Sequence, residues 1–201
     1  MATLDSVNDP YEWVPCTKEV PSDYAREFWY KKYGNKVGLI CLCIDPDNPV
    51  MWSHYGDRHS GMVLGFDCAL DQFKPVHYLD DRVSFDGIEN LDEASRFQLF
   101  NEFLFQKFTD WDYENEYRLY IDLEVAAKKI IINNKLRHFV NIDNELMKLE
   151  EIIVGCNAHG RVGEVVDVLR QGNWICDSNT PKLKVAQFSS TYRMKIVDVT
   201  Y

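Results

Sequence analysis

Short apolar runs alternate with amphipathic stretches along this chain, and the pattern predicts an α+β fold. Val37 to Ile44 is a dense apolar run whose length and flanks favour a buried strand. After Asp92, phenylalanine and leucine recur in steps of three and four, which predicts a capped amphipathic helix. Val162 to Leu169, followed by Gly172, predicts another helix. A third is expected from Ser22 to about Tyr33.

Strand-like segments outnumber these helices. They lie at residues 62–67, 76–85, 111–122, 128–133, 136–142, 151–154, 183–188 and 193–199, and residues 128–133 and 136–142 are predicted to form a hairpin around Asn133-Asn134. Most connections are too short for a β–α–β crossover, so we predict a mainly antiparallel, strongly twisted sheet with about three helices. The sequence contains no repeat, no low-complexity tract and no linker, which favours a single domain over residues 1–201.

Composition and charge narrow the classes of partner. The chain has 201 residues, 46% of them hydrophobic, and a formal net charge of −10 from 22 basic and 32 acidic residues. This charge disfavours duplex nucleic acid and anionic membranes as partners, although it allows a small basic pocket. No secretory signal or membrane-spanning run is recognisable, so a cytoplasmic protein is expected. The six cysteines form no C-x-x-C pair and are expected to be buried free thiols.

The first polar cluster precedes the strand at residue 62. Trp52, His54 and Tyr55 are followed closely by Arg58 and His59. The five-residue spacing of the two histidines suits neither a helix face nor a strand face, so no metal is expected. The cluster can be a turn whose polar groups form hydrogen bonds with buried backbone atoms. Alternatively, it can be the wall of a ligand pocket, in which case all five residues are candidate ligand contacts.

The second polar cluster begins at Trp111. On a strand, Glu114, Glu116 and Arg118 would share one face. That face can be simply solvated, or it can be a paired-carboxylate site in which arginine keeps one glutamate ionised. Two such clusters in a small protein are best explained by one pocket, so we predict that they converge on a single cleft.

Four separated motifs carry a family resemblance. They are Ser6-Val7-Asn8-Asp9-Pro10-Tyr11-Glu12; Met51-Trp52-Ser53-His54-Tyr55 with His59 and Gly61; Trp111-x-Tyr113-Glu114-x-Glu116-Tyr117-Arg118; and Glu151-Ile152-Ile153-Val154-Gly155. In this order they resemble a widespread domain-of-unknown-function family of bacteria and their phages, over nearly the whole chain. The strand and helix that usually precede N-D-P in that family are expected to be missing here.

The motif order is also similar, more distantly, to that of ADP-ribosyltransferases. That resemblance implies that Glu116 binds the nicotinamide ribose of NAD and stabilises the charge formed as nicotinamide leaves, while Glu114 orients the acceptor. Arg58 or Arg118 could hold pyrophosphate, and Tyr55 could stack on nicotinamide. NAD would then be a substrate, and the acceptor a protein or a small nucleic-acid element.

Two other functions remain open. The same pocket could belong to a non-catalytic binding protein, such as a phage-type inhibitor or a nucleotide sponge. A hydrolase or nuclease with the glutamates and histidines around a metal is a third, weaker interpretation. The expected partner is therefore a nucleotide-like small molecule or a protein target, and a role in conflict between phage and host follows from the resemblance.

Overall fold

A computed structural model of the chain describes residues 2–3, 7–9, 11–12, 22–34, 36–81, 90–124, 128–139, 146–172 and 180–200. These residues form the predicted α+β fold. The chain divides into two compact units: unit 1 contains Met1–Ile44 and Leu70–Val140, and unit 2 contains Asp45–Ala69 and Asn141–Tyr201. The single domain predicted over residues 1–201 stays a prediction.

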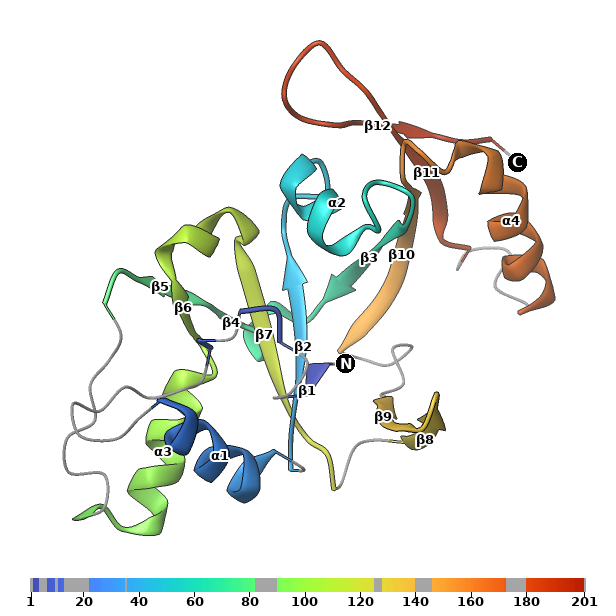
Figure 1. Cartoon of the computed structure of the whole chain (residues 1–201). Helices are drawn as coiled ribbons and strands as arrows, with labels where there is room; N and C mark the ends of the chain where they lie inside the picture. The colour runs from blue at the N-terminus through green and yellow to red at the C-terminus, as the bar shows by residue number, and fades with distance from the viewer. Residues whose placement is uncertain are drawn as a thin grey trace. The chain divides into compact units, whose positions relative to one another are not determined.

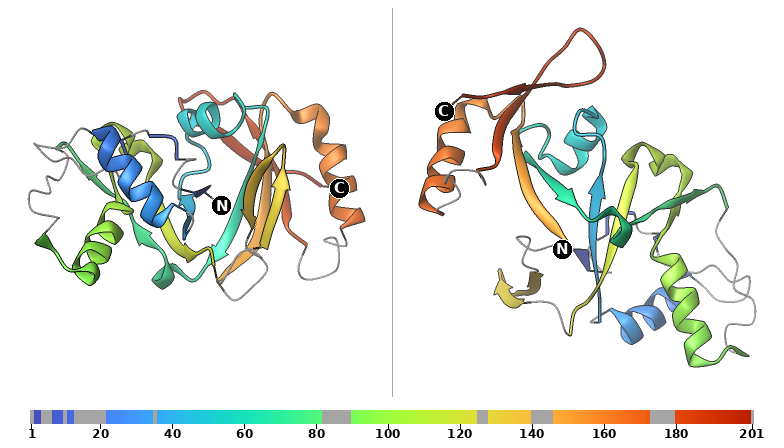
Figure 2. Two further views of the ribbon diagram at one scale, coloured as in Figure 1. Left: turned by 60° about the horizontal axis from the view of Figure 1, so that its bottom comes forward. Right: turned by 180° about the vertical axis from the view of Figure 1, so that it is seen from behind.

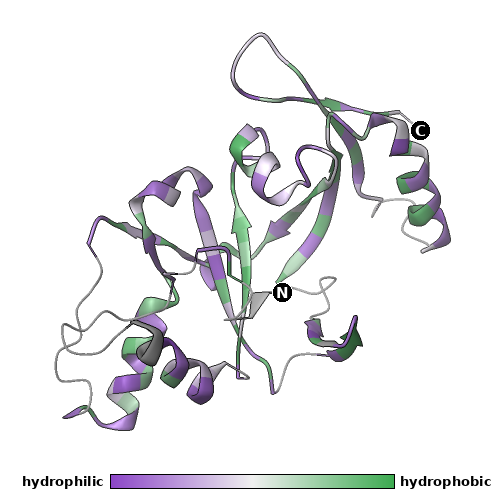
Figure 3. Ribbon diagram, in the orientation of Figure 1, coloured by the Kyte–Doolittle hydropathy of each residue, from purple (hydrophilic) through white to green (hydrophobic). Residues whose placement is uncertain are grey.

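Unit 1 is built on a four-stranded antiparallel sheet. Its strands lie in the order β1 (Ala2–Thr3), β2 (Val37–Cys43), β7 (Glu116–Asp122) and β4 (Lys74–Pro75). β2 and β7 pair along their whole lengths, from Val37 opposite Asp122 to Cys43 opposite Glu116 (Figure 1). β2 is almost wholly hydrophobic, whereas β7 is largely hydrophilic (Figure 3). The polar strand therefore lies beside an apolar one inside the unit.

Unit 1 contains further helices, turns and strands outside this sheet. They are the helices α1 (Ser22–Tyr33) and α3 (Glu93–Phe103), the 3₁₀ turns η1 (Leu70–Gln72) and η3 (Thr109–Glu114), the parallel pair β5 (His77–Leu79) and β6 (Gln106–Phe108), and the hairpin of β8 (Lys128–Ile132) and β9 (Lys135–Phe139). Asp92 caps α3 as predicted, because its carboxylate accepts a 2.7 Å hydrogen bond from the Ser95 N–H. The predicted helix stripe ends early, and Phe108 belongs to β6.

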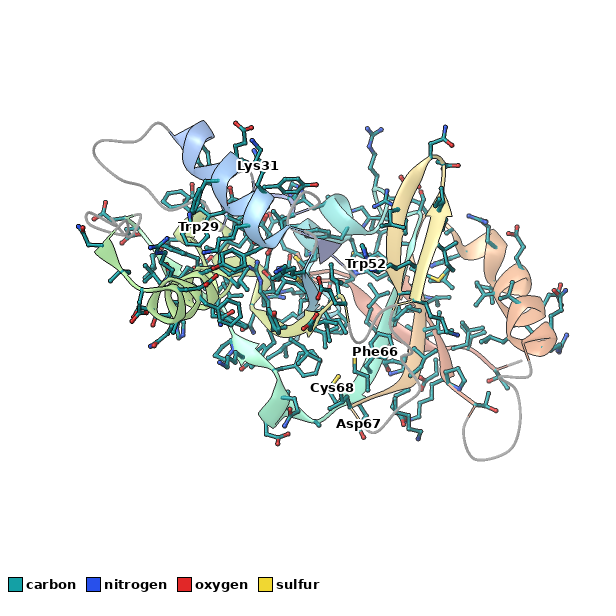
Figure 4. All side chains as sticks on the ribbon, turned by 90° about the horizontal axis from the view of Figure 1, so that it is seen from below. Trp29, Lys31, Trp52, Phe66, Asp67 and Cys68 are labelled. Atoms are coloured by element: carbon teal, nitrogen blue, oxygen red, sulfur yellow. The ribbon has the colours of Figure 1, made fainter. Side chains whose placement is uncertain are left out.

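Stacked aromatic rings form the core of unit 1. The Trp29 ring lies 5.4 Å from that of Phe100, and Tyr33 lies 4.4 Å from Phe100 on centroid distances. These rings join α1 and α3 to Val37 and Leu39 of β2. Trp29 lies on the side of α1 that faces α3, whereas Lys31 lies on its outer side (Figure 4). The helices thus cover only the first half of β2.

Unit 2 contains a second four-stranded sheet. Its order is β12 (Lys195–Asp198), β11 (Lys182–Gln187), β10 (Met147–Val154) and β3 (Met62–Cys68). β10 and β11 are parallel, and the chain between them includes the 3₁₀ turn η4 (His159–Arg161) and α4 (Val162–Gln171). α4 packs along this sheet through Val166 and Leu169 (Figure 2). The strands of the chain are therefore divided between sheets, and this connection is a true β–α–β crossover.

One helix of unit 2 was not predicted. α2 spans Pro49–Tyr55 and is capped by Asn48, whose side chain accepts a 3.0 Å hydrogen bond from the Val50 N–H.

Among the helices that the structure describes, none has the length and apolar character needed to cross a membrane.

The four cysteines in the described ranges form no disulfide. They are Cys41, Cys43, Cys68 and Cys156. The expectation that they are buried is wrong for Cys41 and Cys43, which retain exposed surface, and the remaining two are half-buried. Cys16 and Cys176 lie outside the described residues.

Candidate functional site

The second polar cluster has a different local structure from the one predicted. Residues 109–114 form η3 instead of a strand, and β7 begins only at Glu116. The break is at Asn115, which adopts a left-handed conformation with φ 44° and ψ 55°, an arrangement that asparagine tolerates better than most residues. This turn still directs Glu114 into the interior of unit 1, where 3% of the residue is exposed.

Arg118 is the central residue of a buried ion cluster. Its Nε and Nη2 donate to the two carboxylate oxygens of Glu116 at 2.8 and 2.7 Å. Nη2 also donates to Glu12 Oε2 at 2.6 Å, and Nη1 donates to the Leu104 carbonyl at 2.7 Å. Only 1% of Arg118 is exposed. The alternative of a solvated face is therefore wrong for Glu114, Glu116 and Arg118, because all three are buried.

Lys107 is the second cation of the cluster. Its ammonium donates a hydrogen bond to Glu114 Oε2 and lies 3.1 Å from Glu12 Oε1 and 3.7 Å from Glu116 Oε2. The same ammonium lies 4.6 Å from the ring centroid of Trp111, a cation–π distance. Glu12 therefore joins the two cations, since each of its oxygens contacts a different one. We call these five residues the Glu/Arg cluster: Glu12, Lys107, Glu114, Glu116 and Arg118.

Burial and ion pairing set the charge states within the Glu/Arg cluster. Burial opposes ionisation of Glu116, but the hydrogen bonds and charge of Arg118 outweigh it and lower the pKa of this carboxyl. For Glu12, burial outweighs the attraction of Arg118 and Lys107, and its pKa is raised. Burial alone would lower the pKa of Lys107, but the neighbouring carboxylates raise it. The cluster thus holds Glu116 ionised and has three carboxyl groups for two cations.

One border of the Glu/Arg cluster reaches solvent. Cys43 lies directly opposite Glu116, and Cys41 lies opposite Arg118, in the β2–β7 pairing. Both cysteines retain exposed surface, beyond the part of β2 that the helices cover. The exposed surface of Cys41 does not extend to its thiol group, which is surrounded by protein atoms; burial of the thiol, followed by the charge of Glu116, raises its pKa well above the usual value. Glu116 and Arg118 are therefore the members of the cluster that lie opposite exposed residues of β2.

Aromatic residues surround the cluster. The Tyr78 hydroxyl accepts a 2.9 Å hydrogen bond from the Glu116 N–H, which fixes the start of β7. Trp111 and Tyr113, both half-buried, lie with ring centroids 6.1 Å apart on η3. Burial, followed by the charge of Glu114, raises the pKa of Tyr113. Such rings lower the local polarity and strengthen the electrostatic effect of the carboxylates.

The first polar cluster lies in unit 2, on α2 and the turn after it. Trp52 is 1% exposed and packs against Ile153, and its indole N–H donates to the Pro46 carbonyl at 2.8 Å. His54 and Tyr55 are exposed, with ring centroids 6.3 Å apart. Trp52 is thus a core residue of unit 2, whereas the two residues after Ser53 are at its surface.

The turn after α2 has an unusual backbone. Asp57, Arg58 and His59 have φ values of 46°, 52° and 67°, so three consecutive residues are left-handed. The His59 N–H donates to the Trp52 carbonyl at 3.2 Å, and its Nε2 lies 3.2 Å from the Ser53 hydroxyl. The imidazole stacks on Trp52 with a ring distance of 6.4 Å. These contacts hold His59 in place and favour a structural role for its ring.

The turn is also fixed by the fourth motif. The Gly155 N–H donates to the Gly61 carbonyl at 3.0 Å, and the Asn157 N–H donates to the His59 carbonyl at 3.0 Å. A Cβ atom on Gly155 would lie 2.2 Å from the His59 carbonyl oxygen, so only glycine fits there. The motifs therefore meet in pairs: the second with the fourth in unit 2, and the first with the third in unit 1.

The sequence identified Glu114, Glu116, Trp111 and Arg118, and the structure brings these four residues together. It missed Lys107 and Glu12 as site residues. Glu12 belongs to the first motif, which could have identified it as a site residue, whereas Lys107 belongs to none of the four motifs.

The predicted convergence of the two polar clusters on one cleft stays a prediction, because they lie in different units. The described residues contain no group of three or more His, Cys, Asp or Glu side chains that could hold a metal ion.

Comparisons with curated proteins and with solved structures gave no significant match. The predicted similarity to ADP-ribosyltransferases and the motif patterns themselves stay predictions. A family model does match the chain, from residue 51 to residue 119, a segment that includes Trp52, Lys107 and Arg118. Over this segment the predicted resemblance to a domain-of-unknown-function family is confirmed, and the matching family is described as a protein of unknown function (DUF2971).

Proposed function

We propose that the Glu/Arg cluster is the nucleotide-binding centre of an ADP-ribosyltransferase-like enzyme that uses NAD as a substrate. The observation that carries this proposal is the composition of the cluster: within the described part of the chain, the three carboxyl groups of Glu12, Glu114 and Glu116 form their ion pairs with two cations, Lys107 and Arg118. Nicotinamide in NAD is cationic, and the ribosyl group becomes cationic as nicotinamide leaves. A buried centre with surplus negative charge favours the cationic nicotinamide–ribose end of this ligand, whereas the pyrophosphate has to be held elsewhere.

Glu116 has the properties that this chemistry needs. Arg118 holds its carboxylate ionised and fixes its orientation through two hydrogen bonds. A preorganised carboxylate stabilises a developing positive charge without having to reorganise during the reaction. Cys43 and Cys41 mark an accessible border beside it, from which a ligand can approach. In this proposal Glu114 orients the acceptor, which requires its hydrogen bond with Lys107 to open.

A non-catalytic binding protein is the second candidate, and a specific observation favours it. Both oxygens of Glu116 already accept hydrogen bonds from Arg118, and Glu114 is paired with Lys107. Carboxylates engaged in this way contribute to a fixed architecture as readily as to catalysis. An inhibitor or nucleotide sponge would retain the binding centre without turnover.

The location and the biological setting belong to the same proposal. A cytoplasmic protein is supported by Cys41, Cys43, Cys68 and Cys156, which form no disulfide. A bacterial or phage origin, with a role in conflict between phage and host, rests on the family resemblance.

The decisive experiment combines mass spectrometry with NAD turnover. The purified protein is analysed for a nucleotide carried through purification, and nicotinamide release from NAD is measured for the wild type, Glu116→Gln and Glu102→Gln. Glu102 is an exposed glutamate of α3 and serves as the matched control. Loss of a preorganised charge contact costs about 3 kcal/mol, so Glu116→Gln should lower turnover by about 10²-fold or more.

The outcomes separate the two candidates. Equal turnover by folded Glu116→Gln and wild type contradicts the catalytic role of Glu116. Bound nucleotide without turnover in any variant supports the sponge. Absence of both a bound nucleotide and turnover refutes the nucleotide-binding centre. Circular dichroism of each variant establishes that it is folded.

A further inference from the structure

The β8–β9 hairpin of unit 1 is unusual in its composition. Its two strands and turn, KKIIINNKLRHF, contain four of the chain's 22 basic residues and none of its 32 acidic ones. The rest of the chain is left with 18 basic and 32 acidic residues, so the hairpin is a basic segment on a strongly acidic protein. Its two-residue turn is formed by Asn133 and Asn134, both left-handed, as the sequence predicts.

The hairpin is also strongly exposed and apolar. Five of its large hydrophobic side chains are more than a third exposed: Ile130 48%, Ile131 73%, Ile132 44%, Leu136 54% and Phe139 39%. Hydrophobic and hydrophilic colours lie next to each other on both strands (Figure 3). An isolated two-stranded hairpin is marginally stable in water, and an exposed apolar surface of this kind marks an interaction site.

The strand register places cations and apolar residues on the same face. Directly opposite pairs share a face of the hairpin. On one face the pairs include Lys128 with Phe139 and Ile130 with Arg137. Each of these rows therefore combines one apolar and one basic residue. A partner must offer apolar surface interspersed with carboxylates at a similar spacing.

Two other classes of partner fit less well. A lipid bilayer would have to bury the polar Asn133–Asn134 tip of the hairpin. A nucleic acid would leave three consecutive isoleucines without apolar contacts. An acidic protein surface satisfies both the charge and the apolar side chains.

Unit 1 itself carries such a surface. β5 and β6 are parallel, so the residues that follow them lie at the same end of this two-stranded sheet. Asp80 and Asp81 follow β5, and Asp110 and Asp112 follow β6; all four are exposed. Phe108, the last residue of β6, is 45% exposed beside them. We call this surface the acidic end of β5–β6.

We propose that the β8–β9 hairpin of one copy of this chain docks on the acidic end of β5–β6 of a second copy, and that a two-fold dimer forms through two such contacts. Each copy supplies one basic, apolar hairpin and one acidic surface with Phe108, so two copies related by a two-fold axis make two identical contacts and form a closed dimer. The contact covers Ile130, Ile132 and Phe139, which share the docking face of the hairpin, and pairs lysine and arginine with aspartate. It is independent of the proposed enzymatic function.

Sedimentation velocity of the full chain at several concentrations tests the dimer. At low ionic strength we expect a species of twice the 23.5 kDa chain mass, which dissociates as salt is raised. Lys128→Glu with Arg137→Glu should be monomeric, because the docking face of the hairpin then carries glutamates that repel the aspartates of the acidic end in both contacts. Asp80→Lys with Asp81→Lys should also be monomeric, because basic surfaces then face each other.

Mixing the two double variants provides the strongest test. The glutamate hairpin of one variant then faces the lysine surface of the other, and the second contact of the pair is unaltered. The mixture should therefore recover the dimer that neither variant forms alone. Lys182→Glu with Lys195→Glu, two exposed lysines of unit 2, changes the net charge equally and should remain dimeric. A wild type that is monomeric at every concentration and salt, or a mixture that fails to dimerise, overturns the proposal.

Discussion

Arg118 binds both carboxylate oxygens of Glu116, two positions before it on the same strand, at 2.8 and 2.7 Å. Residues two apart on a strand share a face, so β7 brings the two charges together without any help from another element. The same guanidinium also reaches Glu12, 106 positions earlier, at 2.6 Å. One buried side chain therefore connects the N-terminal segment to the central sheet of unit 1.

Arg118→Met tests this connection. The variant would leave Glu12 and Glu116 buried with only Lys107 as a cation, and removing one partner of a buried ion pair costs about 3–5 kcal/mol. We expect a loss of this size in the free energy of unfolding, measured by urea denaturation. Arg193→Met, which removes the half-exposed 3.1 Å pair with Asp47, should cost less than about 1 kcal/mol. Equal losses in the two variants would contradict the importance assigned to burial.

Local signals predicted much of the fold. Asp92 followed by periodic phenylalanines identified the beginning of α3, and Asn133-Asn134 identified the hairpin turn. In both cases a few neighbouring residues determine the backbone conformation. The sequence does not predict the helix α2, because asparagine followed by proline, as at Asn48-Pro49, is also typical of a loop. The same pair is also an N-cap followed by a proline in the first helical turn, and the sequence alone did not distinguish the two.

The candidate site was harder to predict than the fold. The residues around Glu114 to Arg118 could be found because their charges are close together in the sequence. The strand predicted there was wrong at its start, since Asn115 turns left-handed and separates η3 from β7. Lys107 could not be recognised, because its role depends on contacts made only in the folded chain.

Glu12 gives the stability of the protein a defined pH dependence. Its pKa is raised from 4.5, so the folded state binds this proton more tightly than the unfolded chain does. The stabilising contribution is complete below the unfolded pKa and is lost as pH rises through the folded pKa. Glu116, whose pKa is lowered, has the opposite sign: its contribution is present above 4.5 and is lost as pH falls through its folded pKa.

Glu12→Gln isolates the first of these contributions. We expect the free energy of unfolding of the wild type, relative to Glu12→Gln, to decrease as pH rises above about 4.5 towards neutrality. Urea denaturation of both proteins at half-unit pH steps measures the difference. A difference that increases with pH over this range would show that Glu12 is ionised more readily in the folded state, contrary to its burial.

Gly155→Ala should destabilise unit 2. The new methyl group would lie 2.2 Å from the His59 carbonyl oxygen, which is backbone and cannot rotate away. Overpacking of this kind costs about 1–3 kcal/mol. Gly163, near the beginning of α4, has no heavy atom within 4 Å of the position that a methyl group would take, so Gly163→Ala is the matched control. That control should be neutral or stabilising by less than about 1 kcal/mol, and thermal unfolding of both variants checks the contrast.

His54 and His59 should differ in what their replacement changes. His59→Asn removes the ring that stacks on Trp52 and contacts the Ser53 hydroxyl, while asparagine still tolerates the left-handed backbone. We expect a loss of about 1–2 kcal/mol in the free energy of unfolding.

His54→Asn alters an exposed residue and should leave stability almost unchanged. If His54 is a ligand contact, as the sequence predicts, the same variant should also weaken NAD binding by about 1–2 kcal/mol, which is the value of one hydrogen bond. Thermal unfolding and calorimetric titration with NAD on the same preparation separate the two effects. A large stability loss with unaltered NAD affinity would assign His54 to the scaffold of the turn, and only Glu114, Glu116 and Arg118 would then support a functional centre.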